Sequence, residues 1–159
     1  MERLSLVLWR ERELMETLLF KLEQETLVLS SGRTRWLMRS AREVEAVLEQ
    51  LRDTEIVRSA AADQAAAEVG LADNASLKDL AEACDEPWRT ILLEHRDAFE
   101  QLTREIGESA DSNRALIANG LRSARESLMA VTETLDGYAA DGRVHSAEAS
   151  RQHFVDRSL

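Results

Sequence analysis

The sequence is poor in the residues that interrupt or crosslink a chain. Its 159 residues include only one proline, six glycines and one cysteine, Cys84. So few turn-forming residues argue against a β-sandwich or barrel with many tight turns. A single cysteine excludes an internal disulfide, a four-cysteine zinc site and a CxxC redox motif. The content of 44% hydrophobic and 31% charged residues is instead typical of long amphipathic helices.

The sequence also lacks a long apolar run and an excess of positive charge. The best candidate run, Leu4–Trp9, is followed at once by the charged residues Arg10–Glu13. It is too short for a membrane-spanning helix, which needs about 20 mainly apolar residues, and for a secretory signal peptide. The formal net charge of −10 opposes binding to phosphate backbones. We therefore expect a cytoplasmic protein that neither inserts into a membrane nor binds nucleic acid.

Apolar residues recur at steps of three and four, the spacing that places side chains on one face of a helix. This spacing, together with the turn signals between segments, predicts helices over residues 3–29, 35–69, 77–84 and 88–135. Gly32 is placed to end the first helix in a left-handed conformation, and Thr34 to cap the second. Ser76 can cap the short helix, and Pro87 suits the first turn of the last one.

Short turns between long helices make the helices antiparallel neighbours. The sequence therefore predicts an all-α fold, an antiparallel up-down bundle of three long helices plus one short helix. We expect this bundle to occupy residues 1–137 and to be followed by a flexible C-terminal tail over 138–159. Glu11, Glu25 and Arg58 interrupt the apolar stripes of the first two helices. The alanine-rich end of the second helix, 60–67, either packs closely or frays.

The last predicted helix leaves two alternatives open. Its apolar stripe runs to Leu135 and is interrupted only by Gly107 and Gly120. If the helix is continuous, its late stripe is an unpaired apolar surface, which on a protein in water usually marks a partner site. If the helix breaks at either glycine, the end folds back and completes a four-helix core. Asn113, on the same stripe, either sets the register of the helices or contacts a partner.

No familiar catalytic or metal-binding motif is present. The chain has no GxxxxGK[ST] phosphate loop, no HExxH sequence and no Glu-x-x-His pairs for a di-metal bundle. We therefore expect no catalytic residue, no metal and no cofactor. One alternative is a helical phosphotransfer domain that uses His95, although the small residue expected after such a histidine is missing. A passive helical adaptor is the other alternative.

The last third of the sequence resembles the FlgN-type flagellar export chaperones. In that family a tryptophan opens the long last helix, an asparagine-containing stretch follows, and a signature beginning with tyrosine ends it. The corresponding segments here are Trp88, Asn113–Ile117, Leu128, Leu135 and Tyr138–Arg143. Upstream, Leu27–Gly32 resembles the break that the family has between its first two helices, and Arg58 stands where the family often carries an arginine. Ala110, Val44 and Ala139 depart from the family pattern.

The resemblance implies a binding protein and not an enzyme. Such chaperones hold the C-terminal helical segments of hook–filament junction proteins, prevent their premature self-association and deliver them to the flagellar export gate. It implies that Tyr138 docks on the export gate, and it leaves open whether the free protein forms a homodimer. The expected client-binding residues all lie on the last helix: Asn113, Leu116, Ile117, Leu121, Leu128, Val131 and Leu135.

Overall fold

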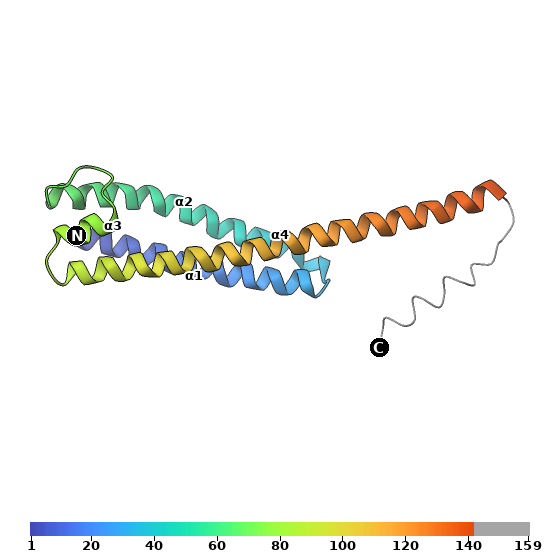
Figure 1. Cartoon of the computed structure of the whole chain (residues 1–159), viewed down its shortest axis with the longest axis horizontal. Helices are drawn as coiled ribbons and strands as arrows, with labels where there is room; N and C mark the ends of the chain where they lie inside the picture. Colours follow the sequence, from blue (N-terminus) through green and yellow to red (C-terminus); the bar gives the residue numbers. More distant parts are fainter. Residues whose placement is uncertain (142–159) are drawn as a thin grey trace. The chain divides into compact units, whose positions relative to one another are not determined.

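The computed structural model describes the backbone of residues 1–141 and the side chains of residues 1–134. Its elements are α1 (Glu2–Ser30), a 3-10 turn η1 (Thr34–Trp36), α2 (Leu37–Glu68), α3 (Leu77–Ala83) and α4 (Trp88–Asp141) (Figure 1). The predicted all-helical class is confirmed for these residues, because none of them lies in a strand. The tail predicted over 138–159 begins inside α4, and residues 142–159 lie outside the described part of the chain.

The turn between α1 and α2 follows the predicted glycine but not the predicted cap. Gly32 has a φ of 65°, the left-handed conformation that glycine adopts without steric cost. Thr34 makes no capping hydrogen bond and instead begins η1, so α2 starts three residues later at Leu37. The 3-10 turn thus replaces the side-chain cap that the sequence predicted at Thr34.

Contacts between α1 and α2 show that these two helices run antiparallel (Figure 1). The N-terminal ammonium group at Met1 lies 2.8 Å from Glu68, near the end of α2. At the other end of the pair, Lys21 Nζ lies 2.8 Å from Glu43 Oε2. Residues early in α1 therefore face residues late in α2.

One core cluster joins α1, α2, α3 and the start of α4. The alanine-rich end of α2 packs closely here and does not fray, since its small side chains let the neighbouring helices approach. The buried members are Leu4, Leu8, Ala61, Ala65, Ala66, Leu80, Ala81, Cys84 and Leu92. Helix α3 enters this cluster through Leu80 and Ala81, held by a capping box in which Ser76 and Asp79 exchange hydrogen bonds.

A second core cluster lies further along α1 and α2. Leu18 and Leu22 of α1 pack on Val47 of α2, with Ile106 and Ala110 of α4 against them. Most buried residues of α1 and α2 lie on one stripe of each helix, as the spacing predicted. On α1 the spacing of three and four predicts that Met15 is buried, but its neighbour Leu14 is the buried residue in the structure.

Helix α4 is continuous from Trp88 to Asp141. The alternative of a break at Gly107 or Gly120 is therefore wrong, and so is the predicted end of this helix at residue 135. A glycine inside a helix costs only about 1 kcal/mol relative to alanine, which is too little to end a helix that is otherwise favourable. No atom lies within 4 Å of the place where a Cβ would stand on Gly107 or Gly120.

The structure divides into two compact units, Met1–Ala118 and a second that begins at Asn119. Both core clusters belong to the first unit. The described part of the second unit is the helical segment from Asn119 to Asp141. The domain division that we predicted after residue 137 remains a prediction.

Candidate functional site

Two of the three charged residues that interrupt the apolar stripes of α1 and α2 form an ion pair with each other. Glu11 Oε2 lies 2.9 Å from Arg58 Nε, and both side chains are largely covered. Burial raises the pKa of Glu11, and the Arg58 charge opposes that rise. Arg58 is therefore held inside the first unit by a carboxylate partner, and the pair is a structural ion pair between α1 and α2.

Asn113 is the polar link between α4 and α1. Its amide nitrogen donates to the Leu22 carbonyl oxygen and to Glu25 Oε2, both at 3.0 Å. Its carbonyl oxygen accepts a hydrogen bond from the Thr26 hydroxyl at 2.6 Å. Only 3% of Asn113 is exposed, so its hydrogen-bonding groups are used within the chain. This arrangement supports the register role, and we remove Asn113 from the predicted client-binding surface.

His95 is buried in an aromatic environment. It is 2% exposed, and its ring meets Trp9 edge-on with centroids 4.9 Å apart. Neither ring nitrogen has a hydrogen-bond partner among the described residues. Burial, and secondly the positive charge of Arg12, lowers the pKa of His95. A phosphotransfer histidine must be reached by its phosphoryl donor, and in this structure the imidazole is covered.

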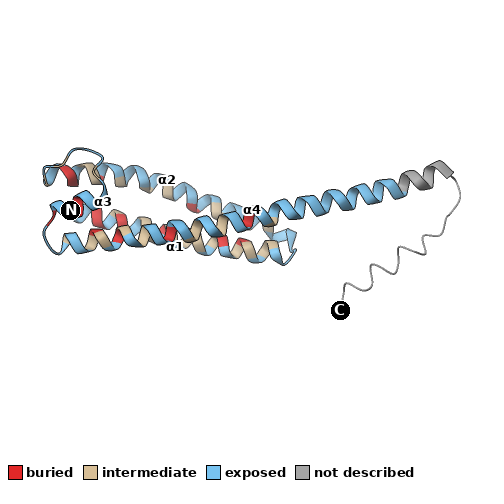
Figure 2. Ribbon diagram, in the orientation of Figure 1, coloured by how far each residue is buried: buried red, intermediate tan, exposed pale blue. Residues whose placement is uncertain are grey.

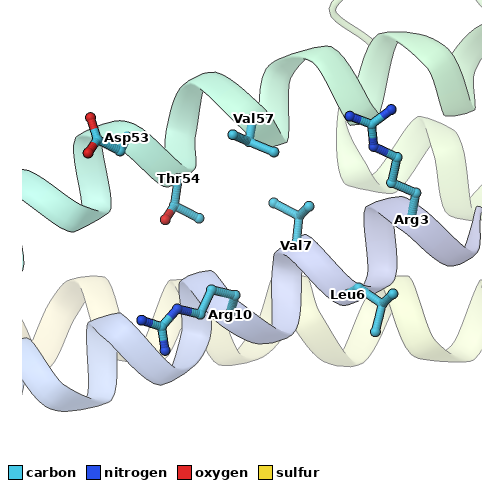
Figure 3. A pocket seen from close by; sticks show the side chains of 7 residues that line it. All are labelled: Arg3, Leu6, Val7, Arg10, Asp53, Thr54 and Val57. Carbon is cyan, nitrogen blue, oxygen red and sulfur yellow. The ribbon is translucent and has the colours of Figure 1, made fainter.

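A groove between α1 and α2 was not predicted from the sequence (Figure 3). It encloses about 370 Å³, with Val7 of α1 and Val57 of α2 pointing toward one another across it. The complete lining is Arg3, Leu6, Val7, Arg10, Asp53, Thr54 and Val57. The available sequence signal was a pair of apolar residues on α1 beside its strongest stripe, Leu6 and Val7, both of which line the groove. No hydrogen bond joins a nucleophilic side chain to a basic one among the residues that line this groove.

No cluster of histidine, cysteine, aspartate and glutamate among the described residues could hold a metal ion. Cys84 is a buried free thiol in the first core cluster, and burial raises its pKa. A raised pKa keeps the thiol protonated and weakens it as a nucleophile. Within the described residues, no helix is both long and apolar enough to cross a membrane.

The apolar stripe of α4 has two kinds of environment. In the first unit its residues Leu92, Leu102 and Asn113 are buried. In the second unit Leu121, Leu128 and Val131 are 56%, 68% and 57% exposed. In Figure 2 the ribbon of this segment has the colour of exposed residues up to the grey end, in agreement with the exposure of residues 119–134. The late stripe is therefore not part of the core of the structure.

The other predicted client-binding residues divide between the units. Ile117, in the first unit, is exposed, and Leu116 is half-buried. The side chains of Leu135 and Tyr138 lie outside the described residues. The backbone of Tyr138 belongs to α4, whereas we had expected this residue to lie in a turn after the helix.

Comparison with known proteins gives one family. A family model described as "FlgN protein" matches residues 1–146. No curated protein and no solved structure matches the chain significantly. The match includes all four α-helices, the buried Asn113 and the exposed stripe of the second unit. The chain therefore belongs to the FlgN family, the flagellar export chaperones.

Proposed function

We propose that this protein captures the C-terminal helical segments of hook–filament junction proteins on the exposed stripe of its second unit. The observation that carries the proposal is the exposure of Leu121, Leu128 and Val131, three large apolar side chains at helical spacing. Such a stripe is suited to an amphipathic partner helix, whose apolar face is removed from water by the contact. Covering the client in this way prevents its premature self-association.

Delivery to the flagellar export gate is the second part of the proposal. We assign gate docking to Tyr138, because a tyrosine combines a large apolar ring with one hydrogen-bonding tip and loses little entropy on binding. The family membership supports a role in flagellar export. The place of action that fits this role is the cytoplasm, and the activity is binding without catalysis or a cofactor.

The capture test is substitution on the stripe. Leu128→Glu and Val131→Glu should each weaken client binding by at least about tenfold, because a charge without a partner would be buried in the complex. Met129→Glu is the matched control, since Met129 is 64% exposed but lies off the stripe. Titration calorimetry with a purified junction protein measures binding, and circular dichroism checks that the fold is intact. Equal binding by stripe and control variants would refute capture at this surface.

The proposed role of Tyr138 is tested by a separate variant. Tyr138→Ala should leave client binding unchanged and reduce binding to the export gate, because it removes a contact outside the capture stripe. Unchanged gate binding by this variant would remove the role assigned to Tyr138.

Sedimentation of the free chain tests whether it forms a homodimer through the stripe, which Leu128→Glu would dissociate. A chain that binds no junction protein would favour the passive adaptor.

A further inference from the structure

The exposed stripe of the second unit has the spacing of a two-stranded helical seam. Leu121, Ala124, Leu128 and Val131 follow one another at steps of three, four and three. In such seams each large side chain of one helix inserts between four residues of the other. Three of these four residues are large, and Ala124 is the exception. An exposed alanine between Leu121 and Leu128 leaves a notch that a partner side chain can fill.

The positions that border this stripe carry almost no charge. They are Gly120, Arg125, Ser127, Thr132 and Thr134. Arg125 is the one charged residue among them, and it forms no ion pair with any described residue. Charges at the border of a helical seam decide which partner is accepted. A lone arginine there is complementary to a carboxylate.

The same stripe on a second copy, over the described residues 120–134, does not supply a carboxylate for Arg125. None of the bordering positions in residues 120–134 is acidic, since Glu126 and Glu133 lie on the opposite side of the helix. In a parallel, in-register pair, Ala124 would face Ala124 and leave a void between the helices. Arg125 would then face Gly120 of the second copy. The stripe is therefore a better match for a different helix than for itself.

We propose that the helix captured here places a large apolar side chain in the notch at Ala124 and a carboxylate beside Arg125. This inference rests on the proposed function, and it identifies which helical segments are accepted. Leu121 and Leu128 can pack against any helix whose apolar residues recur at steps of three and four. Ala124 and Arg125 set the register and select a client helix that has one acidic border.

The experiment uses the full chain and the purified junction protein that binds it. Ala124→Leu fills the notch and should weaken binding by about tenfold or more, because an overpacked contact forces side chains or backbone to shift. Ser123→Leu makes the same change on an exposed position off the stripe and should bind like the unchanged chain. If Ala124→Leu binds as well as Ser123→Leu, the notch plays no part in recognition.

Arg125→Gln tests the carboxylate. It should weaken binding by roughly two- to fivefold at low salt, the range of an exposed ion pair, and the difference should vanish in high salt. Arg122→Gln is the control, because Arg122 lies off the stripe and bonds to Asn119. If the unchanged chain binds the junction protein and both Ala124→Leu and Arg125→Gln bind it equally well, this inference is overturned and the proposed function stands. Absence of any binding by the unchanged chain would overturn both.

Discussion

At the scale of single residues, Glu11, Arg58 and Asn113 make polar contacts between helices inside the first unit. Glu11 pairs with Arg58 between α1 and α2, and Asn113 bonds to Glu25 and Thr26 between α4 and α1. A buried polar or charged group costs free energy when it loses its partner, so sliding one helix past another would break the Glu11–Arg58 ion pair or the Asn113 hydrogen bonds. These residues specify how the helices align more than how strongly they associate.

His95 gives the first prediction at this scale. Its pKa is lowered by burial and by Arg12, with Glu94 as the opposing charge, so the folded protein holds a proton on this ring less tightly than the unfolded chain. The unfolded imidazole takes up its proton as the pH falls through 6.5. Its contribution to stability is therefore complete above that pH and is lost progressively below it.

We expect His95→Phe to remove this part of the pH dependence. A phenyl ring suits the site, which is formed by Trp9 and Phe99. The melting temperature of the variant, measured from pH 8 to pH 5, should fall less steeply than that of the unchanged chain. Glu11 titrates in both proteins, so its effect cancels in the comparison. Parallel curves would show that His95 is protonated equally in the folded and unfolded states.

At the scale of elements, α4 is the helix whose continuity matters for the proposed capture. It passes through Gly107 and Gly120, and no neighbouring atom requires a glycine at either position. Both glycines were predicted as alternative break points, because a glycine disfavours a helix. At Gly107 the cost of about 1 kcal/mol is small beside the packing of α4 in the first unit, and at Gly120 a cost of this size does not by itself end a helix.

Substitutions at Gly120 test the helix of the second unit. Gly120→Ala should slow hydrogen exchange of the amides in 121–134, because alanine stabilises a helix by roughly 0.5–1 kcal/mol over glycine. Gly120→Pro should speed the exchange and weaken client binding, since proline costs about 3 kcal/mol inside a helix. The melting of the first unit should change little in either variant. Full client binding by Gly120→Pro would mean that capture does not need a helix through this point.

At the scale of the whole molecule, the core lies in one unit and the proposed capture surface in the other. Both core clusters, and every buried polar residue among those whose side chains the structure describes, fall within Met1–Ala118. We therefore predict that a chain ending at Ala118 still unfolds cooperatively, with a melting temperature close to that of the full chain. The same chain should not bind a junction protein.

Thermal melts and binding titrations of this shorter chain check both statements. Loss of cooperative unfolding would mean that the first unit depends on residues after 118. Retained client binding would place the capture surface in the first unit instead. The groove lined by Val7 and Val57 would then be the next candidate, because it is an apolar hollow between α1 and α2.

Much of the fold and part of the site could be predicted from the sequence. The apolar spacing predicted each helix to within a few residues, apart from the C-terminal end of α4. The sequence left open whether the late stripe with Leu121, Leu128 and Val131 is core or surface, and the structure shows these residues exposed. The groove at Leu6 and Val57 was missed, because these residues lie away from the strongest stripe of each helix.

The sequence by itself determined the helices, their turns and the resemblance to one family, because these depend on local spacing and on residues close together in the chain. Only the tertiary structure decided which stripe residues are covered. Asn113 and Leu128 lie on one stripe of one helix, yet Asn113 is 3% exposed and Leu128 is 68% exposed. Periodicity specifies the face of a helix on which a side chain lies. It does not specify whether another helix packs against that face, which depends on contacts between residues far apart in the sequence.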